Sequence, residues 1–371
     1  MRSIHLRIGD LRRRKGLTQQ QLAEVAGVSF QTISKWENAS AMPDITYLPV
    51  LAEYFEVSID QLMGLVPLEG EAYVSEATGT GQFWDNKLEY LLRTRRGAWN
   101  NDYVQFLIEQ VWKIKEPVRV LDCGCGYGFL GLLLLPLLPE GSTYTGVDLS
   151  EKLLEKGKAL FADAGLEANL LHKDVYDFQA KEQYDLVISQ AVLRHLDTPE
   201  HFLQKMMTFA KKDAYVVCID TNREFECDGL YVEGMDYFRL CDHTGMEKHW
   251  RTELEQQGRD YAIAIRAAHI MQRLGLREVD VRMNDRVEFV TPKKPDYEQV
   301  KQDFLEYNDW HAGQSREKRE QTVQFFMTHG MSRKEATEYL SHNEEIAEYF
   351  KEHPQAGYTF VKGTMISYGR K

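Results

Sequence analysis

The run from Asp122 to Gly128 constrains the fold of this chain more than any other stretch. It reads D-C-G-C-G-Y-G and directly follows the apolar segment Val118–Leu121. Because glycine adopts backbone conformations that other residues avoid, these glycines allow a tight turn whose backbone can lie close to a ligand. A buried strand, such a turn and an apolar helix are typical of a parallel sheet covered by helices. We therefore expect an α/β domain with a binding site at the end of its first strand.

Length and composition exclude several other classes of protein. The chain has 371 residues, of which 43% are hydrophobic, so we expect at least two folded domains and little disorder. Its longest apolar run, Phe129–Leu138, contains Pro136 and is shorter than the roughly 20 residues of a membrane span. The arginine-rich start lacks the apolar region of a secretory signal, and five cysteines fit a reducing compartment. These features predict a cytoplasmic protein with no membrane partner.

The net charge of −12 is distributed unevenly along the chain. Residues 1–65 contain seven Lys/Arg and seven Asp/Glu, so the whole negative excess lies after residue 65. An acidic protein does not coat nucleic acid with its whole surface. Any contact with nucleic acid must therefore be local.

Residues 1–65 carry the start and stop signals of five short helices. The pairs Thr18/Gln21 and Ser58/Gln61 form capping boxes, and Gly27 is placed to end a helix. The first helix is expected over residues 4–15. A helix, a short glycine-containing turn and a second helix with small polar residues outside form the geometry of a helix-turn-helix.

The motifs of this region resemble the phage-repressor/Cro-like family of bacterial DNA-binding domains. They are L-T-Q-Q-Q-L-A at 17–23, G-V-S-x-x-T-I-S-K-W-E-N at 27–38 and L-A-E-Y-F-E-V-S-I-D-Q-L at 51–62. The resemblance implies an all-α, five-helix domain over residues 1–65 that binds double-stranded DNA, with Arg12–Lys15 near phosphates. It implies that the residues facing DNA are Gln19, Gln31, Thr32, Ser34, Lys35 and Arg13. The alternative is a helical module kept for dimerisation, which the neutral charge of this region favours.

Two different stretches follow this domain. Residues 66–82 are rich in Gly, Glu, Ser and Thr without periodicity, so they are predicted to form a flexible linker. Such a tether, together with the lack of an obvious apolar patch on the first five helices, predicts loose coupling between the two domains. From Phe83 to Trp112 the sequence is helical and rich in aromatic residues and arginine. Most of these residues are expected in the core, and an aromatic lid over a small-molecule site is the alternative.

After residue 117, short β-branched runs alternate with amphipathic helices, which predicts a parallel sheet. The second strand, Ser142–Val147, ends in Asp148, where a carboxylate can accept both hydroxyls of a ribose. A glycine turn alone does not distinguish a dinucleotide from another adenosine cofactor. Three details favour an adenosine cofactor other than a dinucleotide. They are the spacing G-x-G-x-G, Asp122 before the turn, and H-K-D-V after the third strand.

These segments resemble class I S-adenosylmethionine-dependent methyltransferases. Four motifs carry the resemblance: V-L-D-C-G-C-G-Y-G at 120–128, G-V-D-L-S at 146–150, D-V at 174–175 and Y-D-L-V-I-S-Q-A-V-L-R-H-L at 184–196. The resemblance implies a Rossmann-like, seven-stranded α/β domain over residues 83–371 with S-adenosylmethionine as cofactor. It implies that the cofactor-binding residues are Asp122, Gly124, Cys125, Gly126, Asp148, Leu149, Asp174, Val175 and Gln190.

The resemblance also implies a role for each part of this set. Asp122 and the glycines would line the methionine portion, and Asp148 would hold the ribose hydroxyls. Asp174, with the backbone at Val175, would hold the adenine, and Gln190 would lie beside the sulfonium.

His195, just past the fourth strand, is the candidate catalytic base. Its unperturbed pKa suits a base near neutrality, and a hydrogen-bonded core histidine is the alternative. No metal is expected, because the spacing of Cys227, Cys241 and His243 matches no common zinc site.

The remainder of the domain contains two insertions. The core is expected over residues 117–220, strand six near 278–283 and strand seven over 357–368, with helical insertions at 221–258 and 286–356. Long insertions at this edge of the sheet build substrate specificity or mediate dimer contacts, and both remain open.

These features together indicate an enzyme that methylates a small molecule and also binds DNA as a transcriptional regulator, acting as a homodimer. A DNA-modifying enzyme is disfavoured, because Ser189-Gln190-Ala191-Val192 stands where amino-methyltransferases of DNA have an Asn/Asp-Pro-Pro-aromatic tetrad. The alternative is a regulator that senses S-adenosylmethionine without turnover.

Overall fold

The computed structural model describes residues 6–65, 68, 80–95 and 97–371. The predicted linker, residues 66–82, lies almost entirely outside the described residues. The chain divides into two compact units, which are described separately. The first comprises Met1–Val74, His243–Thr252 and Gly313–Asn343, and the second comprises Ser75–Asp242, Glu253–Ala312 and Glu344–Lys371. Segments of both predicted insertions therefore share a unit with the first 65 residues.

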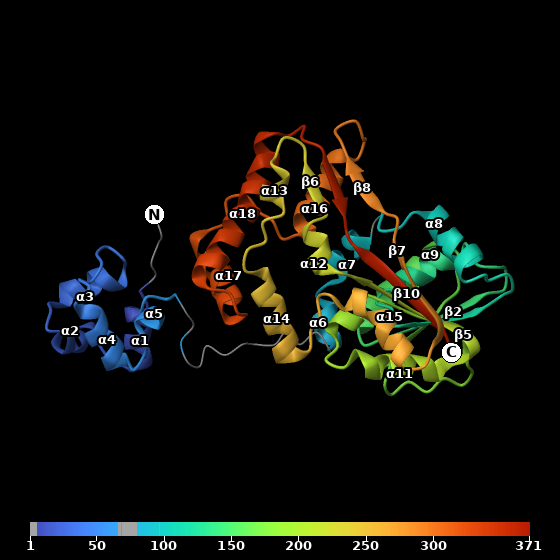
Figure 1. Cartoon of the computed structure of the whole chain (residues 1–371), viewed down its shortest axis with the longest axis horizontal. Helices are drawn as coiled ribbons and strands as arrows, with labels where there is room; N and C mark the ends of the chain where they lie inside the picture. The colour runs from blue at the N-terminus through green and yellow to red at the C-terminus, as the bar shows by residue number, and fades with distance from the viewer. Residues whose placement is uncertain (1–5, 66–67, 69–79, 96) are drawn as a thin grey trace. The chain divides into compact units, whose positions relative to one another are not determined.

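Five helices (blue in Figure 1) form the N-terminal part of the first unit. They are α1 Ile8–Arg14, α2 Gln19–Ala26, α3 Phe30–Glu37, α4 Tyr47–Phe55 and α5 Ile59–Leu62. Both predicted capping boxes are present, at Thr18/Gln21 and Ser58/Gln61, and Gly27 ends α2 with a φ of 66°. The prediction of five helices is confirmed, although α1 begins at Ile8. Apolar side chains from different helices close a common core, with Leu22, Ile33 and Leu51 fully buried.

The first unit also contains α17 Arg316–Thr328 and the first parts of α14 Met246–Gln257 and α18 Arg333–Glu352. Arg333 is buried, and its Nε donates to the carbonyl oxygen of Gly64 at 2.6 Å. Arg7 donates to the side chain of Gln324 at 2.9 Å. The first five helices therefore make polar contacts with part of the second predicted insertion, through two buried arginines. These contacts were not predicted from the sequence, and loose coupling stays a prediction.

A seven-stranded sheet with the order β3-β2-β1-β4-β5-β10-β7 organises the second unit. The first five strands are parallel, and β10 is antiparallel to both neighbours. The strands are β1 Arg119–Cys123, β2 Thr143–Asp148, β3 Asn169–His172, β4 Tyr184–Gln190, β5 Ala210–Thr221, β7 Arg277–Met283 and β10 Thr364–Arg370. The predicted α/β, seven-stranded fold is confirmed.

Helices cover both faces of this sheet (Figure 1). One face carries α8 Asn101–Phe106, the π-helix η1 Leu107–Val111, α9 Phe129–Leu134 and α10 Glu151–Asp163. The other carries α11 Pro199–Phe209 and α15 Ile263–Arg273. The aromatic stretch before β1 serves both predicted purposes. Trp99 and Trp112 are buried in the core, whereas Trp84 and Tyr90 line a cavity, from α6 Gly81–Asp85 and α7 Leu88–Arg95.

The end of the chain differs from the prediction of one strand over 357–368. Gly363, with a φ of 62°, separates β9 Tyr358–Val361 from β10. Only β10 joins the large sheet, because β9 pairs with β6 Leu230–Val232 and β8 Val287–Val290 in a small antiparallel sheet. The expectation that the insertions are purely helical is therefore wrong. The other insertion helices of this unit are α12 Arg223–Cys227, α13 Tyr237–Leu240 and α16 Tyr297–Tyr307.

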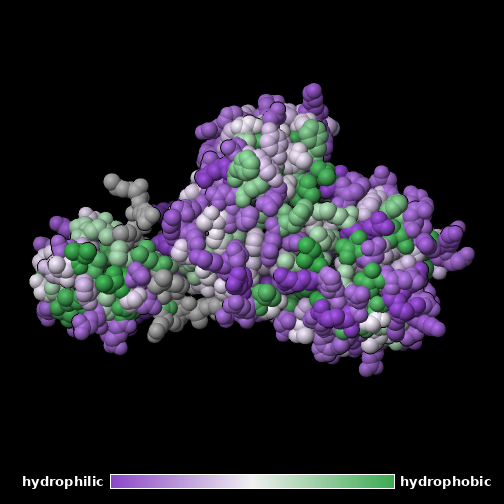
Figure 2. Space-filling view, viewed as in Figure 1, coloured by the Kyte–Doolittle hydropathy of each residue, from purple (hydrophilic) through white to green (hydrophobic). Residues whose placement is uncertain are grey.

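Figure 2 shows hydrophilic side chains over most of the visible face of the second unit. Among the described helices, none has the length and apolar character needed to cross a membrane. The five cysteines are free thiols. Within the described part of the chain, no cluster of three or more His, Cys, Asp or Glu side chains could hold a metal ion.

Candidate functional site

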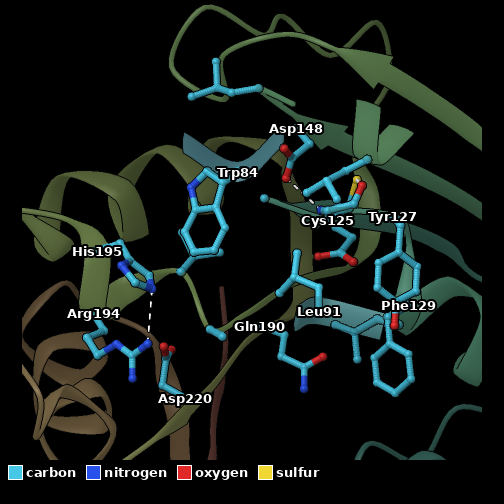
Figure 3. Close-up of a pocket in the computed structure, with 18 of the residues that line it drawn as sticks. Trp84, Leu91, Cys125, Tyr127, Phe129, Asp148, Gln190, Arg194, His195 and Asp220 are labelled. Carbon is cyan, nitrogen blue, oxygen red and sulfur yellow. Dashed lines mark hydrogen bonds between the residues drawn. The ribbon is translucent and has the colours of Figure 1, made fainter. Parts of the chain in front are cut away.

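A cavity of about 290 Å³ lies at the carboxyl ends of β1, β2, β4 and β5 (Figure 3). We call two parts of its wall the glycine end and the arginine end. The glycine end is formed by Asp122, Gly124, Cys125, Gly126, Asp148, Leu149, Asp174 and Val175. The arginine end is formed by Tyr90, Arg95, Arg194, His195, Asp220 and Tyr307. Gln190, at the end of β4, also lines the cavity.

The glycine turn after β1 has the conformation that its sequence predicts. Gly124 and Gly126 have φ angles of 76° and 56°, a region that other residues rarely adopt. The amides of Gly124 and Cys125 donate to the carbonyl oxygen of Val147 at 2.8 and 3.1 Å. A Cβ on Gly124 would lie 2.6 Å from the side chain of Val192. Only glycine allows the turn to pack this closely between neighbouring strand ends.

Asp148 ends β2 and fixes the glycine turn. Its Oδ2 accepts from the amide of Gly126 at 2.7 Å, and its Oδ1 accepts from the amide of Ser150 at 2.8 Å. Burial raises the pKa of Asp148, while these backbone hydrogen bonds oppose the rise. Each carboxylate oxygen has a second lone pair, so Asp148 can still accept hydrogen bonds from a ligand.

Asp122 lies deeper in the wall and is almost fully buried. Its Oδ2 accepts from the hydroxyl of Tyr144 at 2.6 Å, whereas its Oδ1 has no hydrogen-bond partner among the described residues. Burial raises the pKa of Asp122 to about 7, although the hydrogen bond from Tyr144 favours ionisation. A buried carboxylate oxygen without a partner is the kind of group that a ligand satisfies.

The last part of the glycine end follows β3. Asp174 and Val175 line the cavity, and Oδ1 of Asp174 accepts from the amide of Tyr176 at 2.8 Å. All nine residues predicted to bind the cofactor therefore lie in the wall of one cavity, although they come from four separate motifs.

Helix α6 packs directly against the turn after β2. A Cβ on Gly81 would lie 2.1 Å from the carbonyl oxygen of Leu149, and Ser150 Oγ donates to Asp85 at 2.6 Å. From this fixed helix the Trp84 ring contacts the His195 ring edge to face, with centroids 5.0 Å apart. Trp84 is thus the aromatic residue of this stretch that fits the alternative of a lid, which stays a prediction.

His195 lies in the short 3-10 helix η2 Leu193–His195, at the arginine end. Its Nε2 is 3.3 Å from Nη2 of Arg194, and its Nδ1 has no partner among the described residues. Burial, followed by the positive charge of Arg194 and three other arginines, lowers the pKa of His195 well below its usual value. The imidazole is therefore neutral at pH 7 and a weaker base than its sequence position predicted.

Asp220 is the residue of this site that the sequence analysis missed. It lies near the end of β5 and is 3% exposed. Its carboxylate faces the backbone amides of Leu193 and Arg194, and neither oxygen has a hydrogen bond of normal geometry among the described residues. Burial raises its pKa to about 7, against the opposing effect of Arg194. Its position at the carboxyl edge of the fifth strand was the signal that could have identified it. Figure 3 shows Arg194, His195 and Asp220 grouped on one side, away from Asp148 and Cys125.

The candidate DNA-facing residues lie on and beside α3. Gln31 and Lys35 are exposed, while Thr32 and Ser34 are half-buried. Gln19 is half-buried and donates to Glu37 at 2.8 Å.

Three of the four basic side chains in the run Arg12–Lys15 form ion pairs with carboxylates of the same domain. Arg12 Nε pairs with Glu37 at 2.6 Å, and Lys15 pairs with Glu56 at 3.2 Å. Arg13 is exposed and pairs with Asp10. Arg12 is thus held within the domain by Glu37, and the prediction that Arg12–Lys15 lie near phosphates stays a prediction.

Comparison with known proteins identifies two domains. A family model described as helix-turn-helix matches residues 8–62, and one described as methyltransferase domain matches residues 120–213. The chain thus joins a helix-turn-helix domain to a methyltransferase domain with a Rossmann-like fold.

Curated relatives match about a third of the chain. A ubiquinone biosynthesis O-methyltransferase from Rickettsia felis is 23% identical over 141 residues, 38% of this chain and 57% of the relative. One from Salmonella paratyphi A is 30% identical over 121 residues, 32% of this chain and 49% of the relative. The chain thus spans about half the length of these relatives. An N-methyltransferase structure from Haemonchus contortus is 15% identical with a TM-score of 0.41, covering 78% of this chain and 58% of that one.

Proposed function

We propose that the chain is an S-adenosylmethionine-dependent methyltransferase acting on a small molecule, with an N-terminal domain that binds double-stranded DNA. The observation that carries the enzymatic half is the convergence of nine residues, from four motifs, on one cavity. The fold alone would not support this, because Rossmann-like sheets host many activities.

The residues of the glycine end fit S-adenosylmethionine. The turn at Gly124 and Gly126 exposes backbone to the cavity, and Asp122 offers an oxygen that lacks a partner. Asp148 would accept the ribose hydroxyls, and Asp174 with the backbone at Val175 would hold the adenine. Gln190 would lie beside the sulfonium. When bound, this cofactor supplies an electrophilic methyl group with a neutral thioether as leaving group.

The protein's own contribution to such a transfer is alignment, exclusion of water and removal of a proton. Where the acceptor must lose a proton, a base in the wall would receive it. Asp220, with a pKa of about 7, is a stronger base than His195, whose pKa is well below its usual value. We assign proton acceptance to Asp220. Neutral His195 would orient the acceptor by a hydrogen bond.

Turnover distinguishes this enzyme from a regulator that only senses the cofactor. The test is incubation of the full chain with a metabolite extract and S-adenosylmethionine carrying a labelled methyl group. Label in an extracted small molecule, absent with heat-inactivated protein, is the expected result. Cofactor binding without any labelled product would favour the sensor.

The DNA-binding half rests on the helix-turn-helix domain. We propose that Gln31, Thr32, Ser34 and Lys35 face the major groove, with Gln19 beside them and Arg13 near a phosphate. A single short helix reads too few bases for affinity, so we propose a homodimer on a palindromic operator with half-sites ~34 Å apart. A regulator of transcription of this kind would act in the cytoplasm.

A shift assay with the protein's own promoter DNA tests this half. Gln31→Ala should relax base preference, whereas Arg13→Ala should weaken binding to all sequences alike. Absence of any salt-sensitive shift by the intact protein would contradict it.

A further inference from the structure

The arginine end holds more positive charge than its described surroundings neutralise. Arg223 pairs with Glu226, and Lys362, beside Tyr307, pairs with Glu288 at 2.8 Å. Among the described residues, three further cations of this end form no ion pair with a carboxylate: Arg95, Arg194, whose Nη2 lies 3.3 Å from His195 Nε2, and Arg286, which donates to Asn100 at 3.1 Å.

These three arginines line two cavities that share part of their walls. Arg194 lines the main cavity, and Arg286 lines a smaller adjoining cavity of about 40 Å³. Arg95 lines both, together with Gln190 and Tyr307. The Nε atoms of Arg194 and Arg286 are buried without a hydrogen-bond partner in the described part of the chain. Donors that are buried and unpaired cost free energy unless a ligand accepts from them.

Two carboxylates of the wall oppose these guanidinium groups. Asp122 feels the positive charge of Arg95, and burial raises its pKa to about 7. Asp220 feels the positive charge of Arg194 and Arg95, yet burial keeps its pKa near 7, so part of the population is neutral. Arginine remains protonated at every relevant pH. Three arginines against two carboxylates that are each partly neutral leave more than one positive charge at this end.

S-adenosylmethionine would not remove this excess. Its sulfonium and ammonium groups carry two positive charges against one carboxylate, so the cofactor brings further positive charge into the cavity. Its single carboxylate cannot neutralise all three arginines, and Arg95, whose charge reaches Asp122 at the glycine end, is placed to engage it. Arg194 and Arg286 would still need an anion.

We propose that the methyl acceptor is an organic anion, a carboxylate or a phosphate monoester, whose charged group binds Arg194 and the adjoining arginines. The inference rests on the proposed methyltransferase function and names the substrate class of the same site. Planar guanidinium groups suit both anions, because each offers a pair of acceptor oxygens. The stacked rings of Tyr90 and Tyr307, 6.5 Å apart, and the ring of Trp84 provide an apolar surface for a planar body.

Small aromatic probes test this proposal without knowledge of the true acceptor. Benzoate, phenyl phosphate and neutral benzyl alcohol are titrated by calorimetry into the full chain saturated with S-adenosylhomocysteine. At least one anion should bind tenfold or more tightly than benzyl alcohol, and the preferred anion identifies carboxylate or phosphate. Arg194→Gln and, independently, Arg95→Gln should each weaken that binding at least fivefold.

Two controls separate the possible failures. Arg273→Gln changes an exposed arginine of α15 that pairs with Glu200 at 3.2 Å, and it should leave probe binding unchanged. S-adenosylhomocysteine binding to Arg194→Gln within twofold of wild type shows that the variant is folded. If benzyl alcohol binds as well as the anions, or if both arginine variants bind them normally, the anion proposal is overturned. If the unaltered chain does not bind S-adenosylhomocysteine, the proposed function fails instead.

Discussion

The two ends of the cavity are assembled from the chain in different ways. At the glycine end, the turn at Gly124–Gly126 and Asp148 come from neighbouring strands joined by one helix. At the arginine end, Arg95 precedes β1 and Asp220 lies near the end of β5. Tyr307 comes from α16, inside a long insertion. Site residues that lie in short local motifs can be predicted from the sequence. Site residues that distant segments bring together can be identified only once the fold is known.

Substitution of the proposed base, Asp220, tests most strongly whether the glycine end and the arginine end have separate roles. Asp220→Asn should lower methyl transfer by ~10²–10⁴-fold, the usual contribution of a general base. Binding of S-adenosylhomocysteine should stay within twofold of wild type, because Asp220 belongs to the arginine end. Labelled-methyl turnover and calorimetry measure the two quantities.

A matched control uses the same substitution on the same strand. Asp213→Asn changes an exposed carboxylate of β5 that pairs with Arg277, and it should leave turnover unchanged. Turnover of Asp220→Asn within twofold of wild type would reassign proton acceptance to another group.

The pH dependence of turnover should reflect the ionisation of Asp220. Because burial raises the pKa of Asp220 to about 7, the ionised form that accepts a proton increases as pH rises through 7. Turnover should rise ~10-fold between pH 6 and pH 8 and level off above, as expected for one group with this pKa. A pH series of initial rates measures the curve. If Asp220→Asn retains the same inflection, the titrating group is not Asp220.

Trp84 links the two ends and should show a smaller effect on both. Trp84→Ala removes the edge-to-face contact with His195, worth ~0.5–1.5 kcal/mol in aromatic pairs. S-adenosylhomocysteine affinity and turnover should each fall about two- to tenfold, and Trp84→Phe should recover most of both. An effect confined to one of the two measurements would show that Trp84 belongs to one end only.

The sequence predicted the fold best where local signals act alone. Capping boxes at Thr18 and Ser58 and the glycine after α2 marked helix ends, because such caps satisfy backbone groups within a few residues. The strands of the large sheet were likewise predicted from short buried runs. The division of the last strand at Gly363 was missed, because a single glycine between two alternating runs does not reveal that each run pairs with a different sheet.

The same contrast holds within the site. All nine residues predicted to bind the cofactor line one cavity, and each was found because it belongs to a motif at a strand end. Asp220 was missed because an aspartate after a buried strand is common, and its importance depends on burial without a partner. The basicity of His195 was overestimated because three of its four influential arginines lie far from it in sequence.

Calorimetric titration of S-adenosylhomocysteine into Asp148→Ala tests the central claim most directly, with Asp163→Ala, an exposed carboxylate of α10, as control. Loss of the carboxylate leaves two ribose hydroxyls unpaired and releases the amide of Gly126 that it holds at 2.7 Å. The expected cost is on the order of 2–3 kcal/mol, which weakens binding about 30- to 150-fold. Unchanged affinity in Asp148→Ala would contradict the assignment of the glycine end as the cofactor site.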